Sequence, residues 1–71
     1  MKLKRMRELK NITQQELADI LNTSATNISH WESSTNIPQC KSIKLLQSYF
    51  GEGSITMQDF RSEYAIRNGL L

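Results

Sequence analysis

Residues 25–33 carry small polar side chains of the kind that can hydrogen-bond the edges of DNA bases. Ile28 and Trp31, three residues apart, are expected to face inward on one side of a helix. The opposite side is polar and almost uncharged, whereas a solvated helix face usually carries lysine and glutamate. In the major groove, hydroxyl, amide and imidazole groups can bond base edges, and an alanine can contact a thymine methyl. The candidate base readers are therefore Ala25, Thr26, Asn27, Ser29 and His30. An ordinary Ser/Thr-rich helix surface is the alternative interpretation.

Two short helices joined by a tight corner are predicted to position these side chains. The first helix is marked by an apolar stripe that consists of Leu17, Ala18 and Leu21. Thr13 and Glu16 have the spacing of a capping box at its start. Asn22 accepts the left-handed conformation that closes a helix, and Ser24 can cap the next one. The sequence thus predicts helices from about residue 13 to 22 and from about 25 to 33.

The flanking segments predict further helices. A helix over residues 2–10 would place Leu3, Met6 and Leu9 inward. Another would begin near Pro38, which suits a first helical turn, and end at Gly51. Its predicted inner stripe consists of Cys40, Ile43, Leu46 and Phe50.

The end of the chain predicts a last helix. Thr56 and Asp59 again have capping-box spacing. The residues that could line this helix are Met57, Phe60 and Tyr64. Asn68 and Gly69 would end it, which leaves the final pair, Leu70 and Leu71, either in contact with another subunit or frayed.

These signals together resemble the lambda repressor/Cro (XRE-type) family of helix-turn-helix regulators over residues 3–51. The family core Leu-Thr-Gln-x-Glu-Leu-Ala is matched by Ile-Thr-Gln-Gln-Glu-Leu-Ala at residues 12–18. Residues 28–32 (Ile-Ser-His-Trp-Glu) and 37–38 (Ile-Pro) also match. Within the family, the chain is most similar to a small phage Cro repressor.

The chain departs from the family pattern at two kinds of position. Asn11 and Asn22 stand where the family usually has glycine, and asparagine also accepts a positive φ. Residues 33–35 read Ser-Ser-Thr where many relatives carry Arg-Gly-Lys. This second departure removes positive charge that is expected near a phosphate.

The resemblance implies an all-α fold, a compact four- to five-helix domain with the helix-turn-helix at its second and third helices. Residues 1–71 would form a single domain. Residues 1–51 would be its four-helix core, and residues 52–71 would pack on that core or form dimer contacts. Arg7 would pair with Glu32 at the end of the reading helix, where a planar guanidinium can bridge two helices bidentately.

The resemblance also assigns contacts with DNA phosphates. Gln14, at the start of the second helix, would hydrogen-bond a phosphate and brace the reading helix. Residues 1–10 hold five of the nine basic residues and one of the seven acids, which favours contact with phosphates there, although a solvated basic face is the alternative. The other phosphate candidates, on the loop after the reading helix and on the first helix, are Ser33, Asn36, Lys41, Lys2, Lys4 and Arg5.

Composition limits the other functions that the chain could have. Its 71 residues include one cysteine and one histidine, which excludes an internal disulfide and leaves no ligand set for a metal such as structural zinc. There is no glycine-rich phosphate loop or paired acid site, so we expect no enzyme, no cofactor and no small-molecule ligand. No apolar run resembles a signal peptide or a membrane span, so we expect a cytoplasmic protein without membrane contact.

The sequence therefore predicts a sequence-specific, double-stranded DNA-binding transcriptional regulator. The resemblance favours a Cro-like repressor that binds a palindromic operator as a homodimer, with half-sites about 34 Å apart. An antitoxin-type or accessory protein whose tail binds a partner protein is the alternative. A purely structural helical protein would be distinguished by its failure to bind any duplex.

Overall fold

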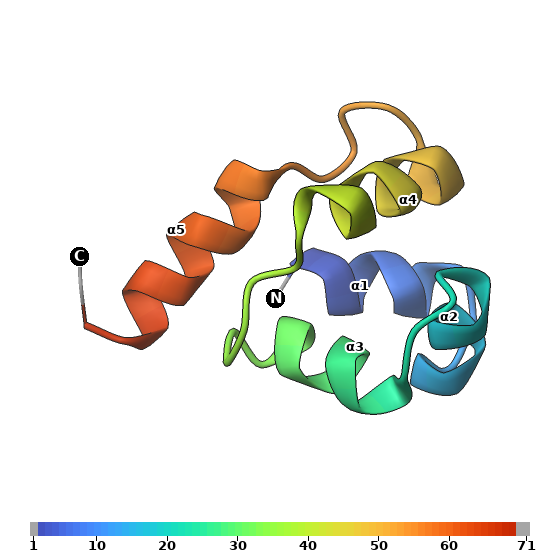
Figure 1. Ribbon diagram of the computed structural model, residues 1–71, viewed down its shortest axis with the longest axis horizontal. Coiled ribbons are helices and arrows are strands. Elements are labelled where there is room, and N and C mark those ends of the chain that lie inside the picture. The colour runs from blue at the N-terminus through green and yellow to red at the C-terminus, as the bar shows by residue number, and fades with distance from the viewer. Residues whose placement is uncertain (1, 70–71) are drawn as a thin grey trace.

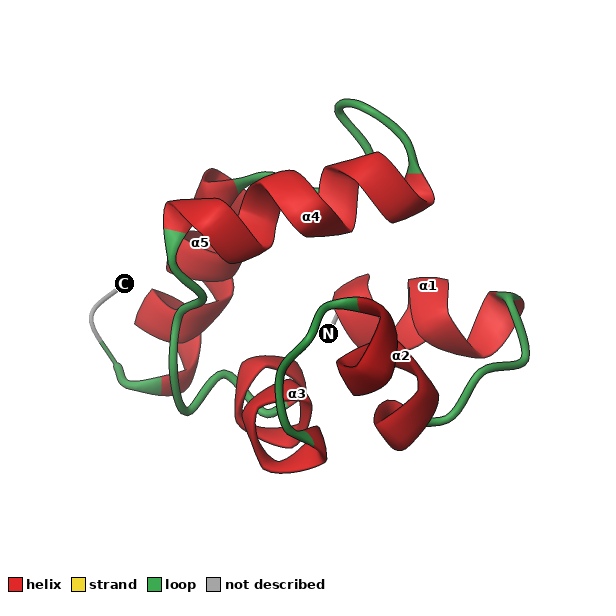
Figure 2. Cartoon of the chain, turned by 45° about the vertical axis from the view of Figure 1, so that its right-hand side comes forward, coloured by secondary structure: helices red, strands yellow, loops and turns green. Residues whose placement is uncertain are grey.

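The computed structural model describes residues 2–69, and the regular secondary structure in that range is helical (Figure 1). The helices are α1 (Lys2–Leu9), α2 (Gln14–Ile20), α3 (Ala25–Glu32), α4 (Cys40–Phe50) and α5 (Met57–Arg67). α1 lies between α4 and α3, and α5 projects to one side of the other four helices (Figures 1 and 2). The all-α prediction is confirmed, with the helix-turn-helix at α2 and α3.

Short polar side chains define where α2 and α3 begin. Thr13 Oγ1 accepts a hydrogen bond from the Glu16 amide at 3.0 Å, and the Glu16 carboxylate accepts from the Thr13 amide at 2.9 Å. Ser24 Oγ accepts from the Asn27 amide at 3.2 Å. Each cap satisfies a backbone donor that the first turn would otherwise leave unpaired, which is typically worth about 1 kcal/mol. The predicted starts of both helices are therefore confirmed.

Within residues 2–69, three residues other than glycine adopt the left-handed backbone conformation. Asn11 (φ 56°) and Asn22 (φ 55°) do so after α1 and α2. A positive φ was predicted at both positions, because the family usually has glycine there and asparagine also accepts this conformation. The third, Ser34 (φ 60°), was not predicted, although many relatives carry glycine at this position. A residue of this kind lets the chain reverse direction directly after a helix.

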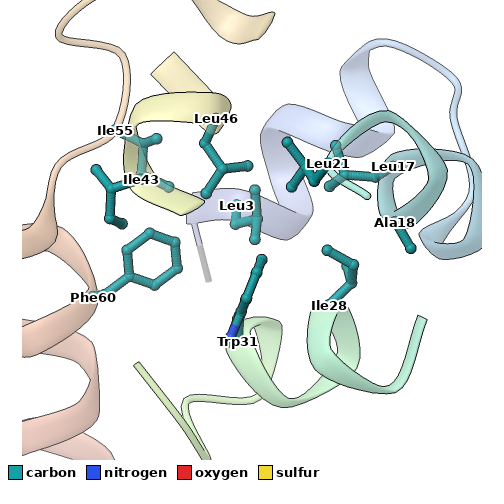
Figure 3. Packing of buried hydrophobic residues seen from close by; sticks show 10 residues of the cluster. All are labelled: Leu3, Leu17, Ala18, Leu21, Ile28, Trp31, Ile43, Leu46, Ile55 and Phe60. Atoms are coloured by element: carbon teal, nitrogen blue, oxygen red, sulfur yellow. The ribbon is translucent and has the colours of Figure 1, made fainter. Parts of the chain in front are cut away.

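The hydrophobic core joins all five helices and the segment before α5 (Figure 3). Its members are Leu3, Leu17, Ala18, Leu21, Ile28, Trp31, Ile43, Leu46, Ile55 and Phe60. Ile28 and Trp31 point from α3 toward α1, as their spacing predicted. This burial fixes which face of α3 remains outside.

Two residues that the sequence placed in the core lie on the surface instead. Leu9 is 79% exposed, and Cys40 is exposed at the first position of α4. A residue six positions along a helix is rotated by about 120° from the first, so Leu9 leaves the face of Leu3 and Cys40 leaves that of Leu46. Pro38 also differs from its prediction, because it precedes the Gln39 cap and lies outside the first turn of α4.

The segment after α4 is attached to the core through three apolar side chains. Ile55 is fully buried and Phe60 is 2% exposed, and both belong to the same cluster as the α3 side chains. Met57 packs against that cluster at the start of α5. Leu70 and Leu71, considered above for a dimer contact, lie outside the described residues.

Two carboxylates of α5 lie at the N-terminus of α1. The Lys2 amide donates to Glu63 Oε1 at 3.3 Å, and Lys2 Nζ lies 3.2 Å from Asp59 Oδ2. Asp59 also completes the predicted capping box, because its Oδ2 accepts from the Thr56 amide at 2.9 Å. Burial alone would raise the pKa of Asp59, but the bonds from Thr56 and Lys2 outweigh it and hold that pKa below its usual value. Negative charge is favourable at this helix end.

Asp59 should make the domain sensitive to acid. Its pKa is lower in the folded chain than in the unfolded one, so its stabilising effect is complete above the unfolded value of about 3.9 and disappears as the pH falls through the folded value. We expect the urea midpoint of the wild-type protein to fall more steeply below about pH 4 than that of Asp59→Asn. Urea titrations between pH 2.5 and 6 would measure this, and parallel curves would contradict it.

Candidate nucleic-acid interface

α3 presents its polar side outward because its apolar side is buried against α1 and α2. Thr26 and Asn27 are exposed, and Ser29 and His30 are partly buried. Ala25 is also partly buried and packs against the core, so only part of its methyl group is accessible. Together these five candidate readers occupy the first two turns of α3 and include no Lys, Arg, Asp or Glu.

An ionic network holds the end of α3. Arg7 Nε lies 2.7 Å from Glu32 Oε2, and a second guanidinium nitrogen lies 3.3 Å from Oε1, so the expected pair is in bidentate contact. Gln14 Nε2 donates to the same carboxylate at 3.0 Å, and Arg7 also donates to the Ile12 carbonyl at 2.7 Å. The hydrogen bond with Glu32 raises the pKa of Arg7 above its ordinary value, against the opposite effect of burial. α1, α2 and α3 are thereby tied together at one point.

Three of the phosphate candidates lie beside a base-reading candidate. Lys4, Gln14 and Ser33 line a shallow depression together with Ser29 and Glu32. One Gln14 donor is used on Glu32, and a primary amide has two. The contact with Glu32 therefore leaves one Gln14 donor for another acceptor.

The other two basic candidates of α1 occupy a different place. Lys2 and Arg5 line a cleft with Glu8 and Glu63, on the side of α1 that faces α5. Lys4 borders this cleft as well as the depression beside α3. Because Lys2 is paired with an α5 carboxylate, its charge is partly neutralised by the protein itself.

The opposite flank of α3 forms a polar hollow with the following loop. Asn27 and Asn36 both line it. The side-chain nitrogen of Asn27, Nδ2, donates to Thr23 Oγ1 at 2.8 Å. The Asn36 side-chain nitrogen lies 3.3 Å from Nδ1 of His30. Lys41 is exposed in the first turn of α4. The candidates thus fall on both flanks of α3, where the two strands of a duplex would pass if α3 entered a groove.

The loop after α3 contributes contacts that the sequence did not reveal. The His30 carbonyl accepts from the Thr35 amide at 2.9 Å, from the Asn36 amide at 3.3 Å and from Ser33 Oγ at 3.3 Å. The left-handed Ser34 permits this return of the chain. The only available signal was the glycine that many relatives carry at that position.

Comparison with known proteins identifies the family. The sequence pattern of a helix-turn-helix family matches residues 3–56, from α1 to the cap of α5. The chain belongs to the helix-turn-helix family. This helix-turn-helix chain is 39% identical over 61 residues to the HTH-type transcriptional activator BcrR of Enterococcus faecalis. The aligned region covers 86% of the chain but 28% of that relative. No solved structure matches the chain significantly.

Membership of the helix-turn-helix family makes the chain a DNA-binding domain of the kind found in transcription regulators, and not an enzyme. Within residues 2–69, no group of three or more His, Cys, Asp or Glu side chains gathers as a metal site would require. None of the helices in the described range has the length and apolar character needed to cross a membrane.

Proposed function

We propose that the chain is a sequence-specific transcription regulator that places α3 in the major groove of duplex DNA. The observation that carries this proposal is the polar face of α3, a helix that the Arg7–Glu32 pair and Gln14 hold against α1 and α2. A helix that is already held in place loses less conformational entropy on binding. The proposed base readers are Ala25, Thr26, Asn27, Ser29 and His30.

Backbone contacts would set the register of α3 on the duplex. Lys4, Gln14 and Ser33 would meet phosphates on one flank, and Asn36 and Lys41 would meet them on the other. Lys2 and Arg5 would act at longer range, since they lie in the cleft between α1 and α5. Because few of these groups carry a full, unpaired charge, we expect a weaker salt dependence than that of strongly basic DNA-binding domains.

The proposed target is a palindromic operator bound by a homodimer, with half-sites about 34 Å apart on one face of the duplex. Repression would follow where the operator overlaps a promoter, as in a Cro-like protein. The name of the E. faecalis relative favours activation as the second candidate. A reporter assay with the selected operator placed over or upstream of a promoter would distinguish the two.

Two substitutions should separate base reading from phosphate contact. Thr26→Ala should weaken binding to a site enriched from random duplexes by about tenfold and leave binding to scrambled DNA unchanged. Lys4→Ala should weaken both alike and reduce the slope of log K against log salt by about 0.9. Lys44→Ala, a matched change at an exposed residue of α4 outside the interface, should do neither.

Titration of each variant on both duplexes at several salt concentrations would measure these effects. Equal losses on enriched and scrambled DNA for Thr26→Ala would contradict the assignment of α3 as the reader. Weak, sequence-blind binding by the wild-type chain would contradict the whole proposal and favour an accessory protein that needs a partner.

A further inference from the structure

The ring of His30 meets a hydrogen-bond donor on its inner side. Its Nδ1 lies 3.3 Å from the side-chain nitrogen of Asn36. An amide nitrogen offers only donors, so a hydrogen bond across this contact requires the imidazole Nδ1 to accept. A neutral imidazole that accepts at Nδ1 carries its proton on Nε2. The contact therefore leaves a donor at the other end of the ring.

The backbone of Asn36, like its side chain, contacts His30. Its backbone amide donates to the His30 carbonyl at 3.3 Å, next to the stronger bond from Thr35 at 2.9 Å. Ser33 Oγ adds a third bond to that carbonyl at 3.3 Å and lies 2.8 Å from Thr35 Oγ1. These bonds hold residues 33–36 against the end of α3. The Asn36 side chain therefore lies beside the His30 ring.

We propose that Asn36 is a positioning residue that holds His30 in the Nε2–H tautomer, so that α3 presents a donor and selects guanine at the base pair beneath His30. This inference rests on the proposed function, because it requires α3 to lie in the major groove. It also gives the Asn36 side chain a role in base selection beside the expected contact with a phosphate.

The groove chemistry explains why this tautomer selects guanine. Guanine presents two acceptors, N7 and O6, to the major groove, whereas cytosine presents the N4 donor. Adenine places its N6 donor beside the N7 acceptor, and thymine places a methyl group beside O4. A ring that can only donate is therefore best matched by guanine and worst by cytosine. The opposite tautomer would present an acceptor and reverse this order.

The tautomer can be measured without DNA. Long-range ¹H–¹⁵N spectra of the imidazole at about pH 8.5 distinguish the two neutral forms. We expect Nε2–H in the wild-type protein. Asn36→Asp should produce Nδ1–H, because a carboxylate only accepts. Gln39→Glu makes the same amide-to-carboxylate change in the same hollow and should keep the wild-type tautomer. Nδ1–H in the wild-type protein, or no change in Asn36→Asp, would overturn the proposal.

Selection from random duplexes at the same pH tests the consequence for DNA. The wild-type protein and Gln39→Glu should enrich guanine at one position of each half-site. In Asn36→Asp, the preference for guanine over cytosine at that position should fall by about tenfold or more. An unchanged preference, despite the altered tautomer, would overturn the specificity that we assign. If the wild-type protein enriches no sequence, the proposed function fails, and the spectra still decide whether Asn36 sets the tautomer.

Discussion

Glu32→Ala should lower the free energy of unfolding by about 3–5 kcal/mol, because it leaves the Arg7 guanidinium buried without its partner. The side chains of Arg7 and Glu32 are 11% and 4% exposed, so the pair is largely shielded from water. A domain of 71 residues has a total stability of roughly 4–11 kcal/mol. The variant should therefore be largely unfolded at physiological temperature, and urea denaturation in the cold would measure the loss.

A double-mutant cycle distinguishes the pair from simple packing. The cycle consists of Arg7→Met, Glu32→Leu and the double variant. The double variant removes both charges, and it should recover much of the stability that either single variant loses. The more exposed pair of Lys2 and Asp59 provides a control, for which the same kind of cycle should yield at most about 1 kcal/mol. Additive losses at Arg7 and Glu32 would show that the two side chains are not coupled in solution.

Phe60→Ala should destabilise the domain by about 3–5 kcal/mol, because it removes a large side chain from a closed core. Phe60 lies on α5, beyond the residues 3–56 that match the helix-turn-helix family, yet it packs with the core of the family domain. Figure 3 places its ring beside Ile43, on the side of the core opposite α2. We therefore expect α5 to be an integral part of this domain.

The matched control for Phe60 lies on the same helix. Ile66 is 66% exposed, so Ile66→Ala should change the unfolding free energy by no more than about 0.5 kcal/mol. Urea midpoints of both variants, read by circular dichroism, would measure the difference. Equal midpoints for Phe60→Ala and the wild-type protein would mean that α5 does not pack on the core in solution.

The candidate interface was predictable to the extent that it depends on one helix. The apolar spacing of Ile28 and Trp31 determined which face of α3 would be buried, and hence which side chains would face outward. The pairing of Arg7 with Glu32 came from the family resemblance, since no local rule links residues 25 positions apart. Lys2 and Arg5 line only the cleft toward α5, whereas Lys4 also borders the depression beside α3, and this difference could not be predicted because it depends on where α5 packs.

The sequence by itself determined the features that depend on residues within about four positions of each other. Thr13, Ser24 and Thr56 cap helices through bonds to amides three residues later, and Asn22 closes α2 through its own backbone preference. Such bonds form within one turn, so spacing alone specifies them. The outward polar face of α3 follows from the same local periodicity.

Only the tertiary structure decided which residues meet across the fold. Leu9 and Cys40 fit an apolar spacing but face solvent, because burial depends on whether a neighbouring helix covers that side. Phe60 reaches the core because the chain returns after α4, and Asn36 meets His30 because Ser34 reverses the loop. These contacts depend on the three-dimensional path of the chain, which short-range hydrogen bonding and helical periodicity leave open.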